Sequence, residues 1–98
     1  IGGTTSTGNV VSANVGNGIR IEGVNNTISG NIVGLNAAGT TGLGNGSHGI
    51  YVTNGGAGTL IGGTTASARN IISGNTNDGI VVDGGNAQTM SSITIAGN

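Results

Sequence analysis

Two acidic residues, Glu22 and Asp83, are the best candidates for chemistry in this chain. Each follows a Gly-Ile-x-[Ile/Val] segment, and Thr53 follows a third copy between them. If these segments are stacked parallel strands, Glu22 and Asp83 lie in one outward column two turns apart, at roughly 9–10 Å. That separation is near the upper limit for the carboxylate pair of an inverting glycosidase. Arg20 and Tyr51 would lie alongside them and bind a sugar or a carboxylate.

The remaining chemical inventory argues against an active site. The chain has three acidic residues, two arginines, one histidine and no cysteine. The middle segment supplies only Thr53, so no tight cluster of acids forms, and His48 in Ser47-His48-Gly49 is interpreted as a surface-loop residue. We therefore predict polar residues on a solvated sheet face, with no catalytic residue. Arg20, Glu22, Tyr51 and Asp83 stay candidates for a carbohydrate-binding face.

Metal and glycan sites have weak signals. Val82-Asp83-Gly84-Gly85-Asn86 is similar to part of a calcium turn, but one carboxylate supplies too little charge for a tight site. We predict no metal and no other cofactor. Asn25-Asn26-Thr27 and Asn45-Gly46-Ser47 fit the glycosylation sequon, and the sequence leaves glycosylation at Asn25 or Asn45 open.

Composition excludes several classes of protein. The formal net charge of −1 and the single aromatic residue, Tyr51, give no basic surface with stacking aromatics for nucleic acid. No segment has the length of a membrane span. The 23 glycines come with no Pro, Phe, Trp or Cys, and the apolar residues are mostly Ile, Val and Ala. This favours a narrow stacked coil over a globule with a core of Leu and aromatic side chains.

Three short units repeat in fixed order about every 30 residues. The first is Asn-[Val/Ile]-[Val/Ile]-x-x-Asn, at 9–14, 31–36 and 70–75. The second is Gly-Ile-x-[Ile/Val], at 18–21, 49–52 and 79–82. The third contains Ile-Gly or Thr-Ile, at 1–3, 27–30, 59–63 and 94–97. Three apolar segments per period predict an all-β coil of about three turns, with three parallel strands per turn and one domain over 1–98.

The register of the second unit predicts the inside and outside of the coil. Two columns should face inward and be buried: Ile19, Ile50 and Ile80, and Ile21, Val52 and Val82. One column should face outward: Arg20, Tyr51 and Val81. A corner ladder of stacked asparagines should consist of Asn14, Asn36 and Asn75. The segments Thr4–Gly8, Ala37–His48 and Thr64–Arg69 interrupt the repeat and should be corner loops.

Two segments of the chain carry a family resemblance. They are Ile-Gly-Gly-Thr-Thr-Ala-Ser-Ala-Arg-Asn-Ile-Ile-Ser-Gly-Asn-Thr-Asn-Asp-Gly-Ile-Val-Val at 61–82 and Gly-Leu-Asn-Ala-Ala-Gly-Thr-Thr-Gly-Leu-Gly-Asn-Gly at 34–46. They resemble parallel β-helix repeats of large secreted bacterial and archaeal surface proteins. The resemblance implies a right-handed, pectate-lyase-like β-helix. It implies no single activity, because such repeats occur in adhesins, in surface-layer and cell-wall proteins and in carbohydrate-active enzymes.

A structural role fits these observations best. We expect an extracellular or cell-surface β-solenoid, uncapped at both ends, that stacks end to end as a filament subunit or within a long adhesin-like protein. Its partners would be copies of itself or adjacent repeats, and a cell-surface polysaccharide is a further candidate. The alternative is a carbohydrate-binding or carbohydrate-cleaving β-helix of the lyase or hydrolase kind.

Overall fold

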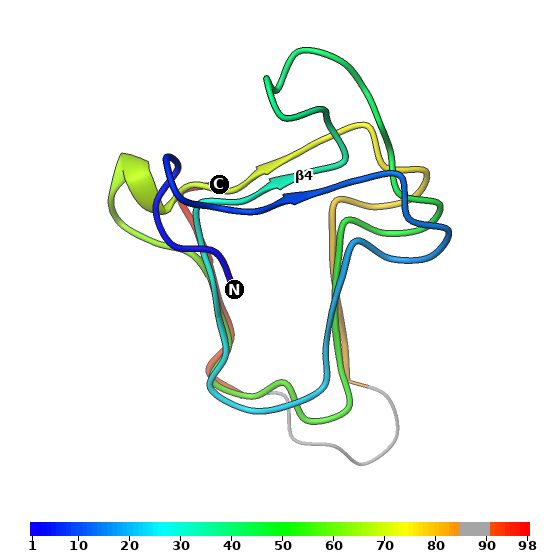
Figure 1. The fold of residues 1–98 in the computed structure, drawn as a ribbon. Helices are drawn as coiled ribbons and strands as arrows, with labels where there is room; N and C mark the ends of the chain where they lie inside the picture. The colour runs from blue at the N-terminus through cyan, green and yellow to red at the C-terminus, as the bar shows by residue number, and fades with distance from the viewer. Residues whose placement is uncertain (85–90) are drawn as a thin grey trace.

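The computed structural model describes residues 1–84 and 91–98, which form short strands and one turn of 3-10 helix (Figure 1). The strands are β1 (Val10–Val11), β2 (Ile19–Ile21), β3 (Thr27–Ile28), β4 (Ile32–Val33), β5 (Ile50–Thr53), β6 (Leu60–Gly62), β7 (Ile71–Ile72), β8 (Ile80–Asp83) and β9 (Thr94–Ala96). The 3-10 helix η1 (Ala66–Ala68) lies between β6 and β7.

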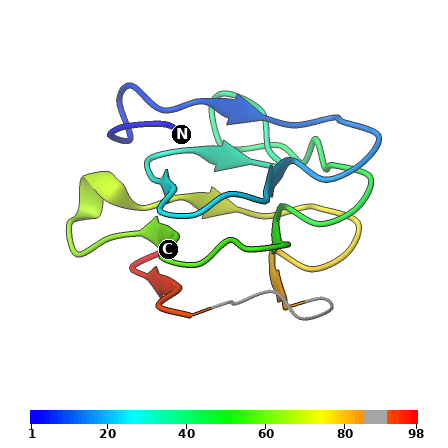
Figure 2. The ribbon, with the colours of Figure 1, turned by 90° about the horizontal axis from the view of Figure 1, so that it is seen from below.

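The strands form three parallel sheets, in the orders β1-β4-β7, β2-β5-β8 and β3-β6-β9. The chain visits the three sheets in turn, so each circuit adds one strand to each sheet. Figure 2 shows these circuits lying one beside the next, with the N-terminus at one end of the stack and β9 at the other. Ile1–Gly3 extends the third sheet through a parallel bridge between Gly2 and Ser29. The predicted all-β structure with three parallel strands per turn is confirmed.

The predicted register of the second unit is also confirmed. Ile19 pairs with Ile50 and Ile50 with Ile80, while Arg20, Tyr51 and Val81 form the alternate column. Ile50 and Val52 in the middle circuit are fully buried, and Arg20 is exposed. Alternation along a strand produces this pattern, because successive side chains point to opposite faces of a sheet.

Burial is incomplete in the last circuit, where the two residues predicted to be buried, Ile80 and Val82, are not. Ile80 is only partly buried, and Val82 is 42% exposed. Their columns end with β8 in the described part of the chain, so no later strand covers them. The buried core therefore consists of residues from the first two circuits, including Ile28 and Ile61 of the third sheet.

At two corners of the coil, asparagine side chains of successive circuits form hydrogen-bonded columns. The first column, between the first and second sheets, was predicted with one wrong member. The column contains Asn14, Asn45 and Asn75, not Asn36. Asn45 is fully buried, and its Nδ2 donates to Val11 O and Asn75 Oδ1. This amide is therefore not accessible to a glycosyltransferase in the fold, whereas Asn25 is exposed.

A second asparagine column, at the corner before the first sheet, was not predicted as a ladder. It consists of Asn9, Asn31, Asn70 and Asn98, joined by side-chain hydrogen bonds of 2.9–3.2 Å. Asn31 and Asn70 are buried. Each corner thus has one asparagine per circuit, and the columns fix the spacing of the circuits.

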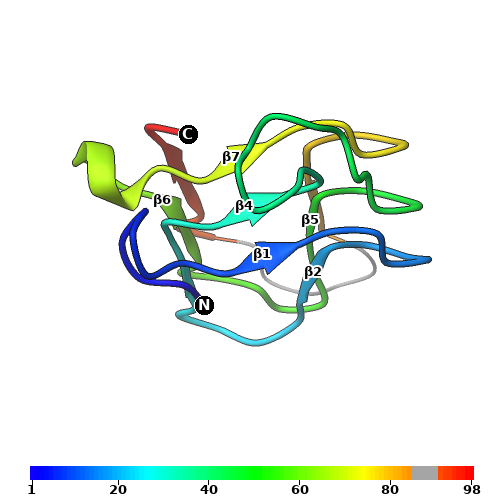
Figure 3. The same ribbon diagram turned by 45° about the horizontal axis from the view of Figure 1, so that its top comes forward.

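The insert in the middle circuit is shorter than predicted. It spans Leu35–Leu43 and closes on itself, because Leu43 N–H donates to Gly34 O and Leu35 bridges Gly42 (Figure 3). The segment 44–48 belongs to the coil, since Gly46 N–H donates to Asn14 O and Ser47 N–H to Gly16 O. The predicted loop Ala37–His48 is therefore wrong over its last five residues.

The other two predicted inserts are loops at a shared corner. Thr4–Gly8 contains a turn in which Thr7 N–H donates to Thr4 O, and Thr64–Arg69 contains η1. The two loops touch through Thr5 N–H and Ser67 O, at 2.9 Å. They project from the same side of the coil before β1 and β7, at the left in Figure 1, and the corner before β4 lies between them.

Candidate functional site

The outer side of the β2-β5-β8 sheet carries most of the ionisable groups of this chain. Six of its seven ionisable side chains lie along this face or at its edges: Arg20, Glu22, His48, Tyr51, Asp78 and Asp83. The seventh, Arg69, directly follows η1. In a chain with only 5% charged residues, this gathering marks the face as the candidate site.

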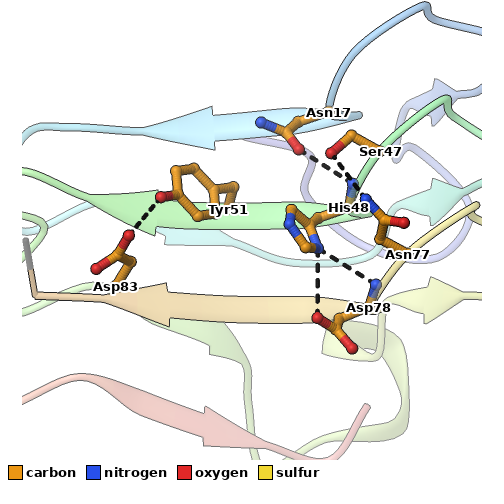
Figure 4. Close-up of polar contacts among 7 residues, drawn as sticks. All are labelled: Asn17, Ser47, His48, Tyr51, Asn77, Asp78 and Asp83. Atoms are coloured by element: carbon orange, nitrogen blue, oxygen red, sulfur yellow. Dashed lines mark hydrogen bonds and ion pairs between the residues drawn. The ribbon is translucent and has the colours of Figure 1, made fainter.

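The structure brings together the four residues predicted from the sequence. Arg20 Nη2 lies 2.6 Å from Glu22 Oε1 in an exposed ion pair. The Arg20 guanidinium carbon lies 5.7 Å from the centre of the Tyr51 ring. The Tyr51 hydroxyl donates to Asp83 Oδ2 at 2.6 Å, across neighbouring strands (Figure 4). The four side chains form one chain of contacts, with each acid engaged by a donor.

The electrostatics of Tyr51 follow from these contacts. The Asp83 carboxylate accepts a hydrogen bond from the Tyr51 hydroxyl, and this raises the pKa of Tyr51 above its usual value. Partial desolvation of the hydroxyl raises this pKa further. A hydrogen bond with Thr53 and the positive charge of Arg20 oppose the shift. Tyr51 is therefore a neutral hydrogen-bond donor at physiological pH.

His48 belongs to this face, contrary to its interpretation as a surface-loop residue. Its side chain is 23% exposed, and its ring is stacked with Tyr51 at 5.6 Å between centroids. Its Nδ1 accepts a hydrogen bond from Asp78 N–H at 3.2 Å and lies 3.5 Å from Asp78 Oδ2. Figure 4 shows His48 between Asn17 and Asp78, which belong to the circuits before and after it.

A sequence signal for this placement exists. Asn17, His48 and Asp78 each stand immediately before the glycine of the second unit. Aligning on that glycine puts all three in one column, and the hydrogen bond from His48 N–H to Asn17 Oδ1, at 3.0 Å, reflects this alignment. The apparent insert before His48 hid the relation.

Neither a metal centre nor an enclosed site is found among residues 1–84 and 91–98. These residues contain no group of three or more metal-ligating side chains and no pocket. The calcium-turn candidate extends to Gly85 and Asn86, which lie outside the described residues. No helix in the described part of the chain is long and apolar enough to cross a membrane.

No protein family, curated protein or solved structure was found to match this chain.

Proposed function

We propose that the chain is a segment of a right-handed parallel β-helix with a structural role. It extends by end-to-end stacking, either within one long surface or adhesin-like protein or between copies in a filament. Parallel sheets fed by consecutive circuits support the β-helix, and connections between parallel strands of one sheet are almost always right-handed. The proposed location is extracellular or at the cell surface, on the strength of the repeat resemblance.

The observation that carries this proposal is the change in burial along the inward columns. Val52 and Ile61 are fully buried in the middle of the coil, whereas Val82 is 42% and Ile95 49% exposed in the last circuit. Val82 follows Val52 in one column and Ile95 follows Ile61 in another, and in the described part of the chain no further strand pairs with β8 or β9. Another circuit would bury them at a gain of roughly 25 cal/mol per Å² of apolar surface.

Sedimentation velocity over a range of concentrations tests the proposal. The unmodified chain should sediment faster as its concentration rises. Val82→Lys, which places a charge on an inward column at the end, should remove this dependence. Val81→Lys is the matched control, because it adds the same charge to the same strand but faces outward. A chain that stays monomeric at its solubility limit would contradict stacking between copies.

A carbohydrate-binding or carbohydrate-cleaving face is the second candidate. It is favoured by the gathering of Arg20, Glu22, Tyr51 and Asp83 on one outer face. Titration calorimetry with acidic and neutral polysaccharides tests it, with Tyr51→Ala and Asp83→Asn expected to weaken binding. Release of reducing ends or unsaturated products would indicate cleavage. Binding that is equally strong in both variants would exclude this face.

A further inference from the structure

The corner between the β1-β4-β7 and β2-β5-β8 sheets contains a hydrogen-bond column with a direction. Asn14 donates from its N–H and Nδ2 to Asn45 Oδ1, at 3.2 and 2.9 Å. Asn45 donates in the same way to Asn75 Oδ1, at 3.1 and 2.8 Å. The hydrogen bonds between neighbouring members of this asparagine column all run from the N–H and Nδ2 groups of the earlier circuit to the Oδ1 atom of the later one.

A second column runs beside it in the opposite direction. His48 N–H donates to Asn17 Oδ1 at 3.0 Å, and Asp78 N–H donates to His48 Nδ1 at 3.2 Å. In this mixed column the side chain of the earlier circuit accepts from the backbone of the later circuit (Figure 4). The Nδ1 atom of His48 thus takes the acceptor role that Oδ1 takes in Asn17.

The two columns give the two ends of the coil complementary groups. In the described part of the chain, the first circuit offers an acceptor, Asn14 Oδ1, and a donor, Asn17 N–H. The last circuit offers a donor, Asn75 N–H, and an acceptor, the Asp78 carboxylate, whose side chain is 75% exposed. In the asparagine column the acceptor is at the first circuit and the donor at the last, and in the mixed column the donor is at the first circuit and the acceptor at the last.

We infer that the coil associates with a second copy of this chain in one orientation only, head to tail, with Asn75 donating to Asn14 and Asn17 N–H donating to Asp78. This inference rests on the proposed end-to-end stacking and specifies its geometry. Head-to-head or tail-to-tail contact would set the strands of the two copies antiparallel, so neither column would continue across the contact and their end groups would lose the partners that the parallel register provides. Tail-to-tail contact would also bring two Asp78 carboxylates into one contact. Unpaired polar groups and like charges in a contact disfavour both alternatives.

Head-to-tail alignment continues the first and second sheets, but in the third sheet two segments compete for one position. It brings Ile1–Gly3 of the second copy to the level of β9 of the first, because both segments occupy the same place in the repeat. One of the two segments leaves its sheet on association. A heterologous contact of this kind does not close, so it propagates along the coil axis.

Complementation between two blocked variants tests the inference. We call the end at the first circuit the head and the end at the last circuit the tail. Asn14→Lys blocks the head, because the lysine ammonium then faces the Asn75 N–H donor of the other copy. Asp78→Lys blocks the tail, because it replaces the carboxylate acceptor with a donor. Each variant alone should lose at least about tenfold in association constant. Their equimolar mixture should form a 1:1 dimer with an affinity similar to that of the unmodified chain. Two controls should behave like the unmodified chain. Asp78→Asn keeps a side-chain oxygen as the acceptor. Val15→Lys adds a charge beside the head, at a side chain that is 97% exposed.

Analytical ultracentrifugation distinguishes the outcomes, with circular dichroism confirming that each variant is folded. An Asp78→Lys variant that dimerises alone reveals head-to-head contact, and an Asn14→Lys variant that dimerises alone reveals tail-to-tail contact; either overturns the inference. Those results leave stacking itself standing. An unmodified chain that never associates overturns the stacking proposal and the inference with it.

Discussion

Asparagine suits both corner columns because its side chain accepts and donates at once. One Oδ1 atom has two lone pairs, and the NH2 group has two hydrogens. Asn70 Oδ1 uses this capacity to accept from both N–H and Nδ2 of Asn31, while Asn70 Nδ2 donates to Ile28 O. A buried residue with all these bonds cannot lose its amide without leaving neighbouring donors unpaired.

Substitution of Asn45 should therefore cost far more than substitution of Asn36. We expect Asn45→Ala to lower the free energy of unfolding by about 2 kcal/mol or more, since it removes the acceptor of two Asn14 donors. Asn36→Ala should stay within about 0.5 kcal/mol, because Asn36 bonds only within its own loop. Urea unfolding measures both. Equal costs would place Asn36 in the column after all.

The tyrosine on the outer face provides a second test at this scale. Tyr51 should ionise at higher pH in the unmodified chain than in Asp83→Asn, because the Asp83 carboxylate accepts a hydrogen bond from the protonated phenol and its charge opposes formation of the phenolate. The folded pKa is raised, so the stability contributed by this bond is present below pH about 10 and is lost as pH rises through the folded pKa.

Ultraviolet absorbance reports this titration directly, because the chain has one tyrosine and no tryptophan. Asp78→Asn is the control, since Asp78 contacts His48 and not the phenol hydroxyl. A Tyr51 titration that is identical in Asp83→Asn and the unmodified chain would show that the hydrogen bond does not persist in solution.

At the scale of the elements, the strands were predicted from the sequence, whereas the middle insert was predicted with the wrong bounds. Alternating Ile and Val in the second unit fixed the register of β2, β5 and β8, because a shift by one residue would turn Arg20 and Tyr51 into the core. No comparable penalty defined the insert. Leu35 and Asn36 complete an Asn-Ile-Val-x-x-Asn string by coincidence and conceal where the coil is interrupted.

Counting backward from the second unit would have located the interruption. Asn14, Asn45 and Asn75 each lie four residues before the glycine that opens this unit, whereas Asn36 lies thirteen before it. The candidate site was missed in part for the same reason, because His48 was assigned to the insert. Side-chain contacts such as the stacking of His48 on Tyr51 depend on rotamers, which the repeat pattern does not specify.

Removal of the insert tests its boundaries. Deletion of Leu35–Leu43 joins Gly34 to Gly44 and gives the middle circuit the same spacing as the last one, where Ser73-Gly74-Asn75 follows β7. The variant should fold with a melting temperature near that of the unmodified chain, since long surface inserts contribute little to stability. Deletion of Gly39–Gly46 removes a similar length but includes Asn45, and it should abolish cooperative unfolding. If both deletions were tolerated equally, the Asn45 column would not support the fold.

At the scale of the whole molecule, stability is shared between neighbouring circuits. Each circuit contacts the one before and the one after through its three sheets and two asparagine columns, so stability should rise with the number of interfaces. The segment Thr94–Asn98 already contributes a rung to the next circuit, because Asn70 donates to Asn98 Oδ1 at 2.9 Å. In the repeat, the residues that follow such an asparagine are a pair like Val10-Val11.

A tandem protein exploits this equivalence. Residues 1–98 fused directly to a second 10–98 segment place Val10-Val11 after Asn98, as Ile32-Val33 follows Asn31, and remove the competition between Ile1–Gly3 and β9. Because the fusion adds an interface that two separate chains lack, its free energy of unfolding should exceed twice that of one chain, with about twice the urea m-value. A fusion of two complete chains through a flexible Gly-Ser linker, with Asn14→Lys and Asp78→Lys in both units to block their contact, is the control, and its two units should unfold like single chains carrying these substitutions. If the direct fusion unfolded with the m-value of one chain, the circuits would not continue across the junction, and the columns would not extend by simple repetition.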